Sequence, residues 1–182
     1  MFSRPSAIIF LRRNSLIVVG RHISAAKLNL PVDIVNNMEV LDRERLVSAC
    51  QDFFADHDLK SKRCLLVLDQ SVVFTKTLEH KKGDDSTSAL ESYISAMPFE
   101  PGKRACLGVE QDDRLLLFAT NAELYQTIAE ALKLSGAGKL VAITPIAAYE
   151  LGKDSESGAA VKRLIEDKIV HAQADFSTVS AA

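Results

Sequence analysis

The sequence predicts an α/β (α+β) protein in which mixed or antiparallel sheets carry helices packed on one face. Two observations lead to this fold class. Short runs rich in Val, Ile, Leu and Thr recur along the chain, a composition typical of strands. Between them lie longer segments whose apolar residues recur at helical spacing. Asn, Asp, Gly and Pro separate the two kinds of segment, as expected of turns.

The composition indicates a globular chain without a nucleic-acid partner. The 182 residues suffice for one domain or two small ones, and 47% of them are hydrophobic. Basic residues number 22 and acidic residues 24, which argues against a nucleic-acid partner because such proteins usually present a basic face. No run of about 20 apolar residues is present, so we expect no direct membrane insertion. The apolar run 7–11 stops at Arg12-Arg13, too early for a signal peptide, and is interpreted as a strand.

The first seventy residues predict strands around one helix. Runs 7–11 and 15–20 form a hairpin across the turn-prone Asn14, and 22–30 forms a third strand. Asp42 caps a helix whose apolar stripe consists of Leu46, Val47, Cys50, Phe53 and Phe54. The continuous apolar run 63–69 is typical of a central strand.

The middle of the chain predicts a strand–helix–strand–strand module. Residues 72–78 form a strand with Phe74, Lys76 and Leu78 on one face, followed by a charged loop that places His80 in solvent. A helix then runs to about Met97 with the stripe Leu90, Tyr93, Ile94 and Met97, and Pro98 stops it. Strands 105–110 and 114–119 complete the module.

The last third predicts a helix, a strand and a polar end. Thr120 and Glu123 fit a capping box ahead of a helix with the apolar face Leu124, Ile128, Ala131 and Leu132. Gly136 and Gly138 end it, strand 139–143 follows, and 145–151 forms a short helical turn. A polar linker at 153–158 leads to a charged helix at 159–170 and a frayed tail at 173–182.

The common catalytic and cofactor motifs are absent from the sequence. It contains no GxGxxG, no GxxxxGK[ST] and no GxSxG. The four histidines are scattered, and the three cysteines are interpreted as buried reduced thiols. The carboxylates at a hairpin tip are interpreted as turn residues in solvent, namely Glu110, Asp112 and Asp113. We therefore expect no enzyme, no cofactor and no metal site.

The order of several degenerate motifs resembles the PilM family of type IV pilus assembly proteins, which are actin-like proteins related to FtsA. The matching stretches are 28–46, 60–78, 93–100 and 115–133, of which SVVFTKTL at 71–78 is the best. Met97-Pro98-Phe99-Glu100 is similar to the family's segment that follows its helix. The resemblance covers about two-thirds of the chain.

Several departures from the family pattern suggest a truncated form that lacks both nucleotide-binding loops. The DxGxxxxK-type loop that opens the family is missing, and so is a second nucleotide-binding half. Asp69 and His80 replace two family prolines. The resemblance then implies trimmed first-subdomain strands at 1–30, an inserted subdomain with a return to the sheet at 31–152, and a linker, helix and tail at 153–182.

The resemblance implies a cytoplasmic scaffold or adaptor, located at the inner-membrane face through a membrane-anchored pilus or secretion protein whose short cytoplasmic tail it binds. The residues expected to receive that tail are Val72, Phe74, Lys76, Leu78, Tyr93, Met97, Pro98 and Phe99. Strand addition at a sheet edge would supply backbone hydrogen bonds. Three alternatives stay open: an enzyme, a small-ligand-binding α/β protein, and a self-assembling structural protein. Homo-oligomerisation also stays open.

Overall fold

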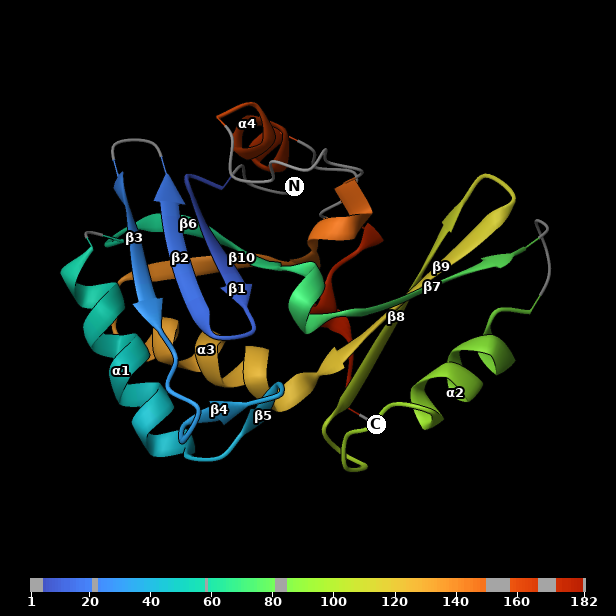
Figure 1. Cartoon of the computed structure of the whole chain (residues 1–182). Helices are drawn as coiled ribbons and strands as arrows, with labels where there is room; N and C mark the ends of the chain where they lie inside the picture. Colours follow the sequence, from blue (N-terminus) through green and yellow to red (C-terminus); the bar gives the residue numbers. More distant parts are fainter. Residues whose placement is uncertain are drawn as a thin grey trace.

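Two sheets organise the fold, a five-stranded sheet and a separate three-stranded sheet (Figure 1). The computed structural model describes residues 5–20, 23–57, 59–80, 85–149, 158–166 and 173–181. His22, His171 and most of the predicted linker at 153–158 lie outside these residues. We call the five-stranded sheet with its helices α1, α3 and α4 the body, and the three-stranded sheet with helix α2 the arm.

The body sheet is mixed, with the order β10-β6-β1-β2-β3. It consists of β1 (Ala7–Arg12), β2 (Ser15–Gly20), β3 (Ile23–Asn29), β6 (Lys62–Leu68) and β10 (Gly138–Pro145). The predicted hairpin is confirmed, because β1 and β2 pair antiparallel from Ala7–Gly20 to Arg12–Ser15. The predicted central strand is confirmed too, since β6 pairs in parallel with both β1 and β10.

Helices cover both faces of the body sheet. Alternate residues of β1 divide between two apolar clusters, as the period of a strand requires. Ile9 and Leu11 pack with α1 (Arg43–Asp56) and α3 (Ala122–Leu134), whereas Ile8 and Phe10 pack with Leu164 of α4 (Gly158–Glu166). The helix predicted at 159–170 therefore lies on the face opposite to the other two (Figure 1).

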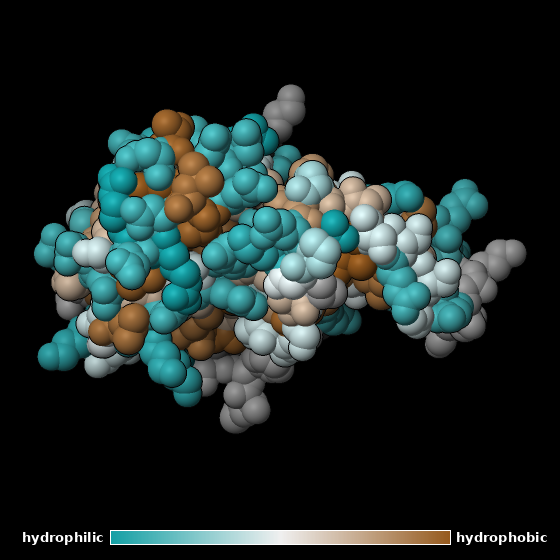
Figure 2. All heavy atoms as spheres, turned by 90° about the horizontal axis from the view of Figure 1, so that it is seen from below, coloured by the Kyte–Doolittle hydropathy of each residue, from teal (hydrophilic) through white to brown (hydrophobic). Residues whose placement is uncertain are grey.

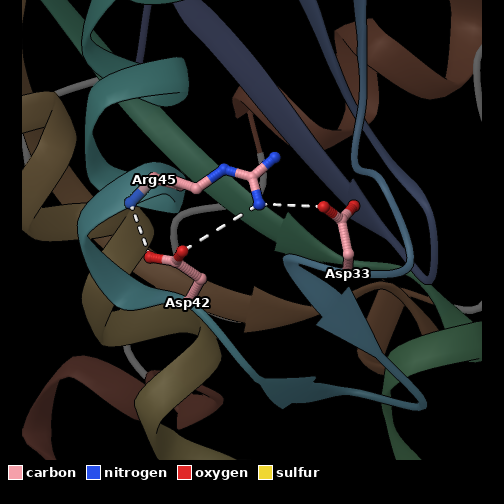
Figure 3. Close-up of polar contacts among 3 residues, drawn as sticks. All are labelled: Asp33, Asp42 and Arg45. Carbon is pink, nitrogen blue, oxygen red and sulfur yellow. Dashed lines mark hydrogen bonds and ion pairs between the residues drawn. The ribbon is translucent and has the colours of Figure 1, made fainter.

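Helix α1 begins where the sequence predicts. The Asp42 side chain accepts a hydrogen bond from the Arg45 amide at 3.0 Å, which satisfies one of the unpaired N–H groups of the first turn. The Arg45 guanidinium bonds Asp33 at 2.8 Å and reaches to 4.0 Å from Asp42 (Figure 3). Asp33 precedes the small hairpin of β4 (Val35–Asn36) and β5 (Glu39–Val40), so Arg45 ties this hairpin to the helix.

The capping box predicted for α3 is wrong. The N-cap is Asn121, whose side chain accepts from the Glu123 amide at 2.9 Å. The Thr120 hydroxyl instead donates to the Val72 carbonyl at 2.6 Å, because Thr120 still belongs to the preceding strand. This bond joins the strand that enters α3 to the segment that precedes the arm.

The arm sheet has the order β7-β9-β8 and pairs antiparallel throughout. It contains β7 (Phe74–Glu79), β8 (Arg104–Gln111) and β9 (Arg114–Asn121), with α2 (Thr87–Ser95) on one face. The short helix η1 (Gln70–Val72) leads from β6 into β7. The strands within 31–152 are thus divided among three sheets, with β6 and β10 in the body sheet, β7, β8 and β9 in the arm sheet, and β4 and β5 in a two-stranded sheet of their own.

The prediction of a frayed tail is wrong for the described residues 173–181. Ala174 and Phe176 are fully buried and Asp175 nearly so. Asp175 accepts a hydrogen bond from the Ile143 amide of β10 at 2.9 Å, and Phe176 packs against Tyr125 of α3. The small helix η3 (Phe176–Thr178) touches both β10 and β8, so this segment, which we call the strap, lies against the body and the arm (Figure 1).

Candidate partner-binding surface

Strand β7 forms an exposed edge of the arm sheet. Five of its six residues are exposed and the sixth, Leu78, is partly buried. Among the described residues it pairs along one side, with β9, from Phe74–Ala119 to Glu79–Arg114. An edge strand presents backbone N–H and C=O groups that another extended segment can pair with.

The face of β7 that carries Phe74, Lys76 and Leu78 is the face beneath α2. These three residues lie opposite Ala119, Leu117 and Leu115 of β9, respectively. A Cβ built on Gly108 of β8 would meet both Leu115 and Leu90 of α2 at 3.4 Å, which places the helix on that face. Because α2 packs on β8 and β9, the β7 side of this face is left open beside the helix.

An aromatic pair borders this open strip. The ring centroids of Phe74 and Phe99 lie 6.0 Å apart, and Phe74 keeps 40% of its surface exposed. Phe99 is buried, and its carbonyl accepts a hydrogen bond from Arg104 Nε at 2.6 Å. The Arg104 side chain of β8 therefore holds the backbone of Phe99, and the exposed Phe74 ring packs on the buried Phe99 ring.

The predicted site residues fall into two groups. Phe74, Lys76 and Pro98 are exposed, and Leu78 and Tyr93 are partly exposed. The other three belong to the core, namely Val72, Met97 and Phe99. Val72 lies in η1 rather than in the strand, and its side chain is fully buried. Its side chain is closed to a partner in the folded chain. The side chains of Met97 and Phe99 are buried too, and the Phe99 ring packs against the exposed Phe74 ring.

The opposite face of the arm holds a pocket that the sequence analysis missed. It has a volume of about 230 Å³ and is lined by Thr75, Thr77, Gln111, Asp112, Arg114, Leu116, Phe118 and Ala147. The period of β7 does put Thr75 and Thr77 on one face, but no local signal places Ala147 of η2 (Ile146–Tyr149) beside them. The pocket gives the β7 edge a mixed polar and apolar lining on this side.

A second, open pocket of about 1070 Å³ lies at the tip of the arm. Its lining residues are Thr77, Leu78, Glu79, His80, Asp112, Asp113 and Arg114. The prediction that His80 lies in solvent is wrong, since it is 6% exposed and its amide donates to the Asp113 carbonyl at 2.9 Å. Its Nε2 lies 3.4 Å from Glu110 Oε1 but makes no hydrogen bond with described residues.

The thiols of the chain are protonated at neutral pH. Burial raises the pKa of Cys50 to about 12 and the pKa values of Cys64 and Cys106 to about 11. Burial likewise raises the pKa of Tyr93 in α2. A thiol with a raised pKa is a poor nucleophile, because the thiolate is the reactive species.

The described residues contain neither a membrane-spanning helix nor a cluster of metal-ligating side chains. No described helix combines the length and the apolar character needed to cross a membrane. Within the described ranges, no group of three or more His, Cys, Asp and Glu side chains is arranged to hold a metal ion.

Comparison with known proteins finds similarity in structure but not in sequence. No protein-family model and no curated protein sequence matches the chain. A structure of the PilM–PilN type IV pilus biogenesis complex matches 80% of this chain and 48% of its own, at TM-score 0.51 and 14% identity. The cytoplasmic domain of EpsL, an inner membrane component of the type II secretion system of Vibrio cholerae, matches 81% of this chain and 60% of its own, at TM-score 0.52 and 9% identity.

These matches concern the fold, and the chain spans about half to three-fifths of the solved structures it resembles. A Bacteroides thetaiotaomicron protein of actin-like ATPase fold also matches, at TM-score 0.45, which is too low to add to the argument. The chain therefore shares its fold with part of a PilM-type pilus protein and part of the EpsL cytoplasmic domain.

Proposed function

We propose that this chain is a non-enzymatic adaptor that binds a short cytoplasmic segment of a membrane-anchored protein of a pilus or secretion machine. The β7 edge receives the segment as an added strand, and the strip between β7 and α2 receives its side chains. Binding holds the adaptor at the cytoplasmic side of the inner membrane through its partner.

The observation that carries the proposal is the exposed edge of β7, bordered by pockets or open strips on both faces. An added strand alternates its side chains between the two faces of the sheet. One set would meet Phe74 and Leu78, and the other set would meet the pocket beside Thr75 and Thr77. Backbone pairing supplies affinity and the alternating contacts supply specificity.

The likeness to PilM and EpsL supports the biological setting. One matched structure is described as a complex of PilM with PilN, and the other as the cytoplasmic domain of an inner membrane component. A role beside a membrane-anchored partner is therefore in keeping with the fold. The absence of catalytic motifs from the sequence supports a role without chemistry, and failure of the purified chain to hydrolyse ATP would agree with it.

A peptide-binding experiment tests the proposal. Overlapping 12-residue peptides would cover the cytoplasmic tails of the membrane proteins encoded beside this chain, and fluorescence anisotropy would report binding. Phe74→Ser should weaken the tightest peptide at least tenfold, because an aromatic anchor near the centre of an interface commonly contributes that much. Leu134→Ser is the matched control, since Leu134 is a 57% exposed apolar residue on α3.

Two proline variants test strand addition directly. Neighbouring residues of an antiparallel strand alternate, with one N–H directed to the paired strand and the next directed outward. Of Lys76→Pro and Thr77→Pro, one therefore breaks the β7–β9 ladder and the other removes an outward donor. The variant that keeps its stability should lose peptide binding. Unchanged binding by that variant, or no binding of any tail peptide to the unmodified chain, would contradict the proposal.

A further inference from the structure

The tip of the arm carries an excess of negative charge next to the end of β7. Its described residues 79–80 and 110–114 contain four carboxylates, namely Glu79, Glu110, Asp112 and Asp113, and one basic side chain, Arg114. Their net charge is −3 with His80 neutral, more negative than the −2 of the whole chain.

The open pocket at the tip joins this charge to the proposed binding edge. Thr77, Leu78 and Glu79 line the pocket and also form the last half of β7. Asp112 and Asp113 line it from the turn between β8 and β9. An extended segment advances about 3.3 Å per residue, so a segment that paired along the whole of β7 would bring its end beside the residues that line the pocket.

His80 adds a buried polar atom to the same place. His80 lines the pocket although it is only 6% exposed. Its Nε2 makes no hydrogen bond with described residues, and Glu110 Oε1, 3.4 Å away, forms an ion pair with it only when the imidazole is protonated. In the neutral tautomer that carries its proton on Nδ1, Nε2 is an acceptor and suits a donor such as an ammonium or guanidinium group.

We propose that the tip pocket selects a basic side chain, Lys or Arg, at the end of the segment that adds to β7. This inference rests on the proposed function and specifies the chemistry of the partner. Cytoplasmic segments close to a membrane-spanning helix are generally enriched in Lys and Arg, which is the charge that this pocket complements. The acidic tip then sets which end of the bound segment lies outermost on the arm.

The test uses the tightest-binding tail peptide and a copy in which its terminal Lys and Arg residues are replaced by Gln. The Gln peptide should bind the unmodified chain roughly five- to tenfold more weakly, the effect expected of one or two exposed ion pairs. Raising the salt concentration should reduce this difference, because exposed charges are screened.

Two double variants of the chain test whether the preference for the basic peptide arises at the tip pocket. Asp112→Asn with Asp113→Asn neutralises the turn, and Asn tolerates the positive φ of 53° at position 112. The His80–Asp113 hydrogen bond uses backbone atoms and is retained. This double variant should bind both peptides equally. Glu39→Gln with Asp52→Asn, which neutralises two exposed carboxylates of the body, should keep the preference for the basic peptide.

The outcomes separate this inference from the proposed function. Equal binding of the two peptides to the unmodified chain would overturn the charge selection and leave the adaptor role standing. A preference that survives Asp112→Asn with Asp113→Asn would also overturn it. If no tail peptide binds, the adaptor role and the charge selection both fail.

Discussion

The body and the arm differ in how far their strands and helices are buried. In the body, β6 and β1 lie inside a sheet covered by helices on both faces, and five consecutive residues of each strand are buried. In the arm, β7 is almost wholly exposed, and α2 has no buried residue. The body thus contains most of the apolar surface that stabilises the fold, whereas the arm offers strand edges, half-buried apolar side chains and charge. Stability is thus expected to depend mainly on the body, whereas the proposed partner surface lies on the arm, and substitutions in the two regions should differ in their effects.

The largest difference is expected between two phenylalanines. Phe54 of α1 is fully buried and Phe74 of β7 is 40% exposed. Phe54→Ala should lower the free energy of unfolding by about 3–5 kcal/mol, because it leaves a cavity in the body. Phe74→Ala should cost about 1 kcal/mol, comparable to the loss of its ring contact with Phe99. Urea unfolding measures both, and equal losses would contradict the division.

The strap tests whether the last residues belong to the body. Asp175→Ala leaves the buried Ile143 amide without its acceptor and should cost about 1–3 kcal/mol. Asp175→Asn keeps an oxygen acceptor and should cost less. If both variants unfold at the same urea concentration as the unmodified chain, the strap contributes nothing to stability.

Alkaline pH should weaken the body through its thiols. Burial raises the pKa of Cys50 from 9.0 to about 12, so the folded protein holds the thiol proton above the pH at which the unfolded chain releases it. The contribution of this protonated thiol to the free energy of unfolding is complete below pH 9. It is lost at about 1 kcal/mol per pH unit as the pH rises towards 12. Unfolding at pH 8 and pH 10 measures the loss, and Cys50→Ala should flatten the dependence.

A smaller effect is expected at the start of α1. Asp42→Ala removes the cap of the first turn and should cost about 1 kcal/mol, whereas Asp42→Ser retains a capping oxygen. Binding of a tail peptide should be unchanged in both variants, because Asp42 lies in the body. A change in affinity would show that the two regions are coupled.

The smallest effect is expected in thiol labelling, which compares the accessibility of cysteines in the two regions without a substitution in either. Cys106 lies half-buried in the arm, whereas Cys50 and Cys64 are fully buried in the body. Segments with few buried contacts open more readily than the core does. Under native conditions, mass spectrometry should find Cys106 modified by iodoacetamide before the other two. Simultaneous modification of all three would indicate that body and arm open together.

Sequence patterns predict the helices and strands better than they predict the burial and the contacts of single residues. Periodicity located β1, β2, α1, β6 and the arm strands, because alternation and the Asp42 cap are local properties. The burial of His80 and of the strap is not predicted, because it depends on contacts with residues far along the chain. The His80 amide donates to the Asp113 carbonyl, and Asp175 accepts from the Ile143 amide. The buried position of Val72 is not predicted for a similar reason. Its carbonyl accepts a hydrogen bond from the hydroxyl of Thr120, which lies 48 residues further along the chain.

The same limit applies to the candidate surface. Alternation placed Phe74, Lys76 and Leu78 on one face, and the register agrees. The sequence could not show that α2 leaves β7 uncovered, nor that η2 closes a pocket on the other face, because both depend on packing between distant segments. The role of these residues in binding a partner stays a prediction.

The position of the arm within the chain has a consequence for folding kinetics. Strand β6 ends at Leu68 and its parallel neighbour β10 begins at Gly138, so all of the arm lies in the loop between them. Closing a long loop costs entropy that grows with its length, and non-local pairing is slow for this reason. The β8–β9 hairpin can form early and shorten the loop that remains to be closed. Variants that weaken this hairpin should therefore delay completion of the body sheet, although they lie outside it.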